Sequence, residues 1–136
     1  MSLSLDTTTV VDLLKGDRAV KERLRTCLAN GELVVVSAVV LEELVYGAAA
    51  SGASERELRK VEVALTGLQL EPMTADDARL AGQHRARQRA AGLPLGAYDG
   101  LIAGHARARG WTLVTSDQKL MRNIMDVPVE NWREPQ

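Results

Sequence analysis

The stretch Gly96–Asp117, read GAYDGLIAGHARARGWTLVTSD, constrains the fold of this chain more than any other. Its pattern predicts a helix, a tight glycine turn, a short buried strand and a polar tip. In the helix, Asp99 falls on the same face as Ile102 and Ala106 by i, i+3, i+7 spacing. A carboxylate on an apolar helix face must be paired, protonated or bound to a cation. The strand then delivers Asp117 to its C-terminal end, which is the edge where ligands bind in open α/β sheets.

Helix and strand patterns alternate along the whole chain, with turn residues between them. Strands are expected over 2–6, 33–36, 68–70 and 112–115, with an edge strand at 127–129 because Pro128 removes a ladder donor. Helices are expected over about 10–14, 18–30, 38–50, 55–65, 75–91, 97–109 and 119–124. Asp17, Ser37, Ser54 and Thr74 are predicted N-caps. The alternation predicts a single α/β domain over residues 1–136 with a parallel sheet.

Composition narrows the classes of partner. Aromatic residues make up 3% of the chain and none is Phe, so an extended platform that stacks many bases is excluded. The formal net charge is -1, so no overall field attracts nucleic acid. Six arginines nevertheless lie between positions 79 and 109 against Asp99 alone, a local balance of +5. Within this group Arg85 and Arg89 repel each other at i, i+4 unless an anion lies between them, which predicts phosphate binding. The alternative is a solvated face whose arginine stems cover alanines.

Cysteine usage and hydropathy bear on location. A single Cys27 excludes an internal disulfide and fits a reducing compartment, and its place on an apolar stripe predicts a core residue. The chain has no charged leader and no apolar run that approaches the roughly 18 residues of a membrane span. We therefore expect a cytoplasmic protein without a membrane partner.

Four acidic residues are placed to act together. Asp6 and Asp117 follow predicted strands, whereas Glu43 and Asp99 lie on helices beside them. If the two strands are neighbours, the acids converge at one sheet edge, where they repel one another unless a cation is present. Mg²⁺, with Mn²⁺ as a substitute, fits such oxygen ligands and can ionise a water for attack on phosphorus. Zinc does not fit, because one Cys and two scattered His give no ligand spacing. The alternative is that each acid is a helix cap or a solvated surface charge.

Several motifs occur in register along nearly the whole chain. They are Leu5-Asp-Thr7, Val11-Asp-Leu-Leu, Ser37 with Glu43-Leu-Val-Tyr-Gly47, Tyr98-Asp-Gly-Leu-Ile-Ala103 with His105-Ala106, and Leu113-Val-Thr-Ser-Asp117. In this order the sequence resembles the PIN-domain family, and more narrowly the VapC toxins of bacterial type II toxin–antitoxin modules. Thr8 departs from the pattern, since the family usually has Asn there, and this bears on the hydrogen bonds around Asp6.

The resemblance implies a three-layer α/β/α fold and a Mg²⁺-dependent endoribonuclease. It implies that Asp6 and Asp99 are the principal metal ligands and that Asp117 acts directly or through a water. It also selects Glu43 over Glu42, a choice that spacing leaves open, to position the attacking water or a second ion. Thr115 is implied as a supporting hydroxyl. Cleavage by a metal-bound water predicts 5′-phosphate and 3′-hydroxyl ends.

The resemblance also implies partners: an RNA substrate, a small VapB-type antitoxin whose C-terminal segment covers the acidic pocket, and a homodimer. The stretch Ala48 to Ala53, with Leu58, Val61 and Leu65, fits a dimer face or an antitoxin groove as well as it fits ordinary core. Of the two histidines, His105 is expected to be a hydrogen-bonded helix residue and His84 to lie on the surface.

Two competing functions stay open. One is a catalytically silent binding module that keeps the fold. The other is a Mg²⁺-binding phospho-acceptor receiver domain, which would want adjacent acids after the first strand, whereas Asp6 stands alone.

Overall fold

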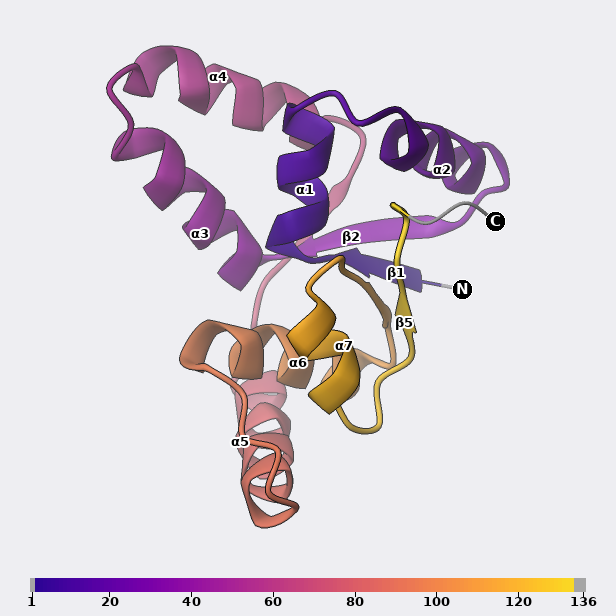
Figure 1. The fold of residues 1–136 in the computed structure, drawn as a ribbon, viewed down its shortest axis with the longest axis vertical. Coiled ribbons are helices and arrows are strands. Elements are labelled where there is room, and N and C mark those ends of the chain that lie inside the picture. Colours follow the sequence, from indigo (N-terminus) through magenta and orange to yellow (C-terminus); the bar gives the residue numbers. More distant parts are fainter. Residues whose placement is uncertain (1, 134–136) are drawn as a thin grey trace.

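A five-stranded sheet lies at the centre of the computed structural model, which describes residues 2–133 (Figure 1). Its strand order is β3-β2-β1-β4-β5, and every neighbouring pair is parallel. The strands are β1 (Ser2–Leu5), β2 (Leu33–Ser37), β3 (Gln69–Glu71), β4 (Thr112–Val114) and β5 (Val129–Glu130). The predicted parallel sheet is thus confirmed, and its edge strand lies at Val129–Glu130, after Pro128, rather than over 127–129.

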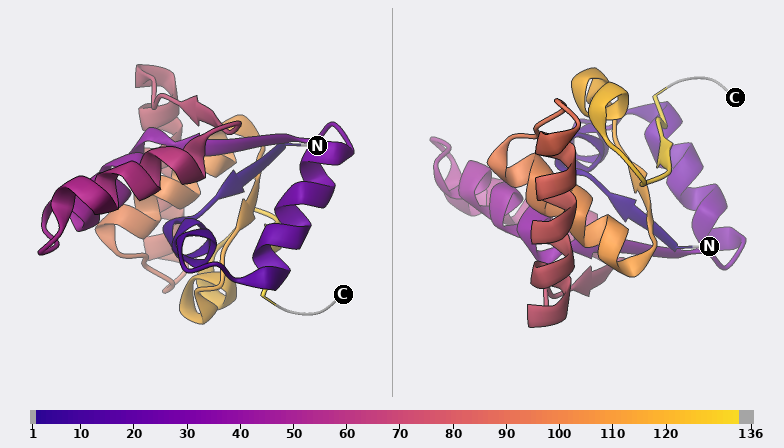
Figure 2. Two further views of the ribbon diagram at one scale, coloured as in Figure 1. Left: turned by 90° about the horizontal axis from the view of Figure 1, so that it is seen from above. Right: turned by 90° about the horizontal axis from the view of Figure 1, so that it is seen from below.

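Helices cover both faces of this sheet. They are α1 (Thr7–Leu14), α2 (Arg18–Ala29), α3 (Ala38–Ala49), α4 (Ser54–Leu65), α5 (Ala75–Ala90), α6 (Ala97–Arg109) and α7 (Gln118–Asn123). Figure 2 shows α1 to α4 in front of the sheet from one side and α5 to α7 in front of it from the other. The arrangement is the three-layer α/β/α fold implied by the sequence.

The strand order creates a switch point between β1 and β4. From β1 the chain winds outward to β2 and β3 on one side, and β4 and β5 lie on the other. Ligands of open α/β sheets bind in the crevice at the carboxyl ends of such strands. The receiver-like order is 2-1-3-4-5, so the observed order contradicts the receiver-domain alternative.

The central strands are buried on both faces, as their continuous apolar sequence predicts. Residues 3–6, 34–37 and 111–115 all belong to the buried class. Trp111 and Trp132 are also buried, at 5% and 1% exposure. Cys27 lies in this core, where burial raises the pKa of its thiol to about 12. It is therefore a structural and unreactive residue.

Helices α5 and α6 approach each other closely at one glycine. A Cβ atom built on Gly104 would lie 2.5 Å from the Cβ atom of Ala81 and 2.7 Å from its Cα atom. Only a residue without a side chain fits this crossing. The contact fixes α6, which carries Asp99, against α5, which carries the arginines.

The structure corrects the prediction for His84, which is fully buried rather than exposed. Its Nε2 atom lies 2.8 Å from the carbonyl oxygen of Met125. One turn later, the buried Gln88 side chain donates to the carbonyl oxygens of Leu93 and Asn123 and accepts from the Met125 N–H group. These polar residues of α5 satisfy the backbone of two loops, which is a tertiary role without a local sequence signal.

Two helix starts also differ from the predictions. Helix α1 begins at Thr7 rather than near residue 10, because the Asp6 carboxylate caps it by accepting from the Thr7 N–H group at 2.8 Å. Helix α4 has Ala53 as its N-cap with no side-chain hydrogen bond, so the predicted Ser54 cap is wrong. The preceding Ser51 hydroxyl instead accepts from the Ala53 N–H group and donates to the Ala48 carbonyl.

Within residues 2–133, none of the helices combines the length and the apolar character required to span a bilayer. The cytoplasmic location stays a prediction.

Candidate active site

Four elements bring acidic residues to the carboxyl end of β1 and β4. Asp6 directly follows β1, and Asp117 is the N-cap of α7 just after β4. Asp99 lies in the first turn of α6 and Glu43 in the second turn of α3. The parallel register of β1 and β4 pairs Leu5 with Val114, and the Asp6 N–H group donates to the Val114 carbonyl at 2.8 Å. Asp6 and Asp117 therefore leave the same edge of the sheet.

Asp6 is the most buried of these carboxylates, at 3% exposure. Its Oδ1 atom accepts from the Thr7 N–H group at 2.8 Å and its Oδ2 atom from the Thr115 hydroxyl at 2.7 Å. Burial raises the pKa of Asp6 to about 6, against these two hydrogen bonds, and the charges of Asp99 and Glu43 raise it further. A carboxylate held this way is oriented but poorly compensated, which favours the approach of a cation.

Asp99 is half-buried and belongs to the same electrostatic field. Burial raises its pKa, the negative charges of Asp117 and Glu43 add to the effect, and Lys119 opposes it. The charges of Asp99 and Glu43 act on Asp6, and those of Asp117 and Glu43 act on Asp99, so Asp99 links the four acids into one electrostatic site. The structure therefore brings together the four acids that the sequence singled out.

Glu43 is directed toward this site, and its neighbour Glu42 is not. The Glu43 Oε1 atom accepts from the Thr7 hydroxyl at 2.7 Å, which links α3 to the first residue of α1. Glu42 is exposed and lies near the phenol of Tyr98. Helix geometry separates adjacent side chains by about 100°, so only one of the two acids can face the crevice.

Threonine hydroxyls organise the acids. Thr115 donates to Asp6, accepts from the Asp117 N–H group at 3.1 Å and lies 3.3 Å from the Thr8 hydroxyl. Thr8 in turn accepts from the Ser116 N–H group at 3.2 Å. Since the Thr115 proton goes to Asp6, the Thr8 hydroxyl is left to donate to Thr115. The residue that departs from the family pattern thus supports the loop between β4 and α7.

Sequence reasoning named Thr115 and singled out Thr8 as bearing on the hydrogen bonds around Asp6, but it gave Thr7 no role. The available signal was a run of three threonines directly after an acid at a strand end. Threonine is a weak helix former, so its use throughout a first turn indicates hydroxyls with another role.

The donor set fits a hard divalent cation. Within the described residues, no group of three acidic, His or Cys side chains is close enough to ligate one ion together. Mg²⁺ needs only one or two carboxylates, since it retains several waters. Asp6 and Asp99 can supply such oxygens, and oxygen ligands are the ones that Mg²⁺ prefers.

The two arginines predicted to bind substrate occupy α5 beside this site. The Cδ and Cγ atoms of Arg85 lie 3.9 and 4.0 Å from the position of a Cβ on Gly100, so the Arg85 stem crosses the turn that holds Asp99. Arg89, one turn later, lines a shallow hollow with Arg85, Pro94 and Leu95. Both side chains are exposed, as phosphate ligands must be.

His105 takes no part in the site. It is fully buried, its Nδ1 atom lies 2.8 Å from the Ser37 hydroxyl, and its ring packs on Trp111 at a centroid distance of 4.7 Å. Burial lowers its pKa, although Asp77 lies 3.4 Å from Nε2. The expected structural histidine therefore joins the start of α3 to α6 and to Asp77, which is also held by Arg109 at 2.8 Å.

Comparison with known proteins agrees with this geometry. The model of the PIN domain family matches residues 3–124. The tRNA(fMet)-specific endonuclease VapC of Salmonella typhimurium is 34% identical over 133 residues, which are 97% of this chain and 98% of that protein. Among solved structures, VapBC2 from Rickettsia felis bound to a promoter DNA fragment matches with a TM-score of 0.90, 32% identity and coverage of 97% and 99%. DNA-bound VapBC from S. typhimurium matches with a TM-score of 0.89, 33% identity and coverage of 97% and 98%.

A three-layer domain with four acids at its switch point, matched over most of its length by the PIN model, defines the class: the chain belongs to the PIN-domain family. Within that family, relatives that match over nearly the full length are VapC proteins, as the sequence motifs suggested.

Proposed function

We propose that this protein is the toxin of a type II toxin–antitoxin pair and acts as a Mg²⁺-dependent endoribonuclease. The observation that carries the proposal is the convergence of Asp6, Glu43, Asp99 and Asp117, with raised pKa values for Asp6 and Asp99, at the switch point of the sheet. The VapC relatives, which are named as ribonucleases or endonucleases, support the same reaction.

We assign to each acid the role that the family resemblance implies, and its position in the structure supports that assignment. Asp6 and Asp99 would hold the ion, and Asp117 would reach it directly or through a water. Bound there, Mg²⁺ supplies a nucleophilic water and neutralises charge on the leaving oxygen. Glu43, oriented by Thr7, would align the attacking water and accept its proton. Attack by water needs no 2′-hydroxyl, so we expect 5′-phosphate and 3′-hydroxyl ends.

Arg85 and Arg89 would bind the phosphates that flank the cleaved bond. A planar guanidinium binds a phosphate with two parallel hydrogen bonds, and the position of Arg85 beside the turn of Asp99 puts such a donor next to the acids. Without these cations the four carboxylates would repel the RNA backbone.

Cleavage of structured RNA tests the proposal. The wild-type protein should cleave with Mg²⁺, and EDTA should stop the reaction. Asp99→Asn should lower the rate by at least about 100-fold, since it removes a charge from the proposed metal site. Asp76→Asn is the matched control, because Asp76 is exposed and its side chain is hydrogen-bonded only to Arg79 among residues 2–133. Full activity of the Asp99→Asn variant would refute the site assignment.

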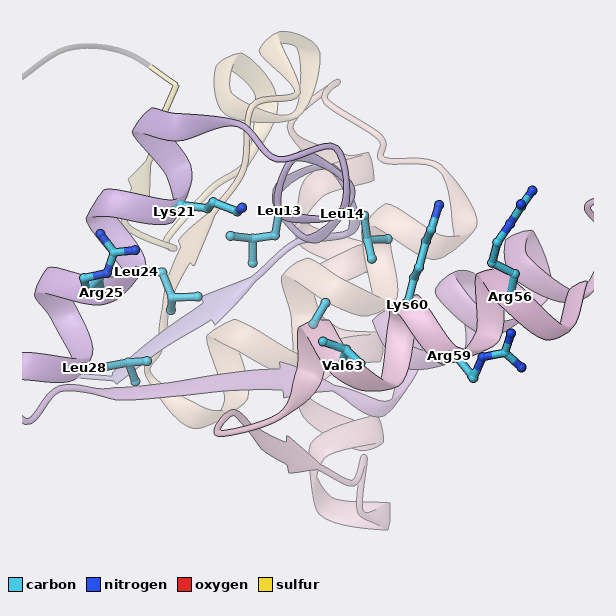
Figure 3. A pocket seen from close by; sticks show the side chains of 11 residues that line it. Leu13, Leu14, Lys21, Leu24, Arg25, Leu28, Arg56, Arg59, Lys60 and Val63 are labelled. Carbon is cyan, nitrogen blue, oxygen red and sulfur yellow. The ribbon is translucent and has the colours of Figure 1, made fainter. Parts of the chain in front are cut away.

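A groove between α1, α2 and α4 fits the expected antitoxin. Figure 3 shows leucines of α1 and α2 and Val63 of α4 directed into the space between these helices. The rim is basic and none of the lining residues is acidic; it consists of Lys21, Arg25, Arg56, Arg59 and Lys60. An apolar floor with a basic rim fits an amphipathic helix that carries acidic residues beside its apolar stripe.

This basic groove continues toward the acidic site. Leu14 and Arg56 line both the basic groove and a second hollow between α1, α3 and α4. The second hollow is also lined by Thr7 and Glu43. An antitoxin segment that leaves the groove along this path would reach the carboxylates and block RNA. The homodimer stays a prediction.

A further inference from the structure

The few aromatic residues of this chain are divided sharply by location. Both tryptophans are buried, whereas Tyr46 and Tyr98 are 70% and 45% exposed. Neither tyrosine ring stacks on another aromatic ring or on a cation within residues 2–133. Exposed, unoccupied ring faces are the usual means by which proteins hold unpaired bases.

Both tyrosines lie on the helices that carry the acids. Tyr98 directly precedes Asp99 at the start of α6, and Tyr46 comes one turn after Glu43 in α3. Helices α3 and α6 are in contact, and the phenol of Tyr98 lies near Glu42 of α3. The Tyr98 phenol also feels the charge of Glu43 and lies near Tyr46. The two rings therefore lie beside the acidic site, on the two helices that carry Glu43 and Asp99.

The negative charge of the site favours uncharged aromatic rings as RNA-binding groups. Four carboxylates repel the phosphates of an approaching RNA strand, so part of the affinity for RNA must come from uncharged groups. Stacking of a base on an aromatic side chain is such a contribution and tolerates any base. Two rings are too few for the extended platform that the composition excludes, but they are enough for the one or two nucleotides beside the scissile bond.

We propose that Tyr46 and Tyr98 form a two-ring platform on which unpaired bases next to the scissile phosphate stack. This assignment rests on the ribonuclease function proposed above. The platform requires single-stranded or looped RNA, because paired bases have no free faces. A protein partner is disfavoured, since the exposed large apolar residues of α3 and α6 are only Val45, Tyr46, Tyr98 and Leu101 among residues 2–133, far fewer than the roughly 20–30 residues per side of a stable interface.

Binding measured without cleavage tests the platform separately from the reaction. In an Asp99→Asn background, Tyr46→Ala and Tyr98→Ala should each weaken binding of a short single-stranded RNA about 10-fold or more. Affinity for the same RNA paired with its complement should stay within about 2-fold. Tyr46→Phe and Tyr98→Phe should retain single-strand affinity, since the ring remains. Leu33→Ala, at an exposed residue that begins β2 at the other end of the sheet, is the matched control.

A fluorescent base analogue in the RNA adds a direct signature: its emission should fall on binding to the tyrosine proteins and to the Phe variants, but not to the Ala variants. Equal losses for single-stranded and paired RNA, or loss in the Phe variants, would overturn the proposal. A molecular mass in solution that is half that of the wild type for either Ala variant would also overturn it, because the tyrosines would then belong to an interface between two copies of the chain. If the wild type cleaves RNA while the Ala variants bind normally, the platform fails and the proposed function stands. If the binding differences appear but the wild type does not cleave RNA, the platform stands and the proposed function fails.

Discussion

The buried carboxylate of Asp6 costs the protein stability and makes that stability depend on pH. Its pKa is about 6 in the folded protein against 3.8 as an ordinary aspartate. Between these two values the folded state binds more protons than the unfolded state, so the free energy of unfolding falls as pH rises from about 4 to about 6. The shift corresponds to a loss of about 3 kcal/mol above pH 6.

Asp6→Asn should remove this loss. Without divalent ions the variant should be more stable than the wild type at pH 7, by up to about 3 kcal/mol, and show little gain at pH 4. It should also lose RNA cleavage. Urea unfolding at the two pH values, with Asp76→Asn as the exposed control, measures the effect. A stability difference that is the same at both pH values would show that the burial of Asp6 is not its cause.

At the scale of the element, helix α6 owes its position to Gly104. A methyl group there would meet the Ala81 Cβ atom at 2.5 Å and the Ala81 backbone at 2.7 Å, and neither can move independently of α5. Gly104→Ala should therefore destabilise the fold by about 1–3 kcal/mol, despite the better helix propensity of alanine.

Gly100→Ala is the matched comparison within the same helix. The added methyl group would lie 3.9 Å from the flexible Arg85 side chain, which is an ordinary contact, so we expect a gain of up to about 1 kcal/mol from propensity. Thermal and urea unfolding of both variants measure the contrast. Similar stabilities for the two would refute the close approach of α5 and α6.

Elements with local signals could be predicted from the sequence. The capping box at Thr74 and Asp77, the cap at Asp17 and the left-handed Gly110 that ends α6 all appear as expected, because each depends on a few neighbouring residues. The convergence of Asp6 and Asp117 was expected from their strand ends on the condition that the two strands are neighbours, which the pairing of β1 with β4 fulfils. The burial of His84 could not be predicted, because its partner is a loop carbonyl 41 residues away.

The candidate site was predictable only in part for the same reason. Spacing did not separate Glu42 from Glu43, since the choice depends on how α3 is rotated against α1, and the family motif had to supply it. The hydrogen bond from Thr7 to Glu43 spans 36 residues and fixes that rotation. A long-range contact of this kind leaves no local pattern.

For the whole molecule, a net charge of -1 conceals a separation of charge. The acids gather at the sheet edge, whereas the rim of the basic groove between α1, α2 and α4 carries only cations among its charged residues. This asymmetry would let the proposed partner, an acidic amphipathic antitoxin segment, be attracted to the groove while its continuation shields the acids. Association of such a segment should weaken as salt is added.

Substitutions in the basic groove should weaken antitoxin binding without changing RNA cleavage. Val63 is 74% exposed and lines the groove floor, so Val63→Asp should fold normally and cleave RNA like the wild type. Its affinity for the cognate antitoxin should fall by about 10-fold or more, because the new carboxylate would be removed from water against the apolar stripe of the partner. Arg59→Glu should act in the same direction through the rim. Leu70→Asp, at an exposed residue of β3 outside the groove, is the control. Co-expression and titration calorimetry with the antitoxin measure the affinity, and unchanged binding by both groove variants would place the antitoxin elsewhere on the toxin.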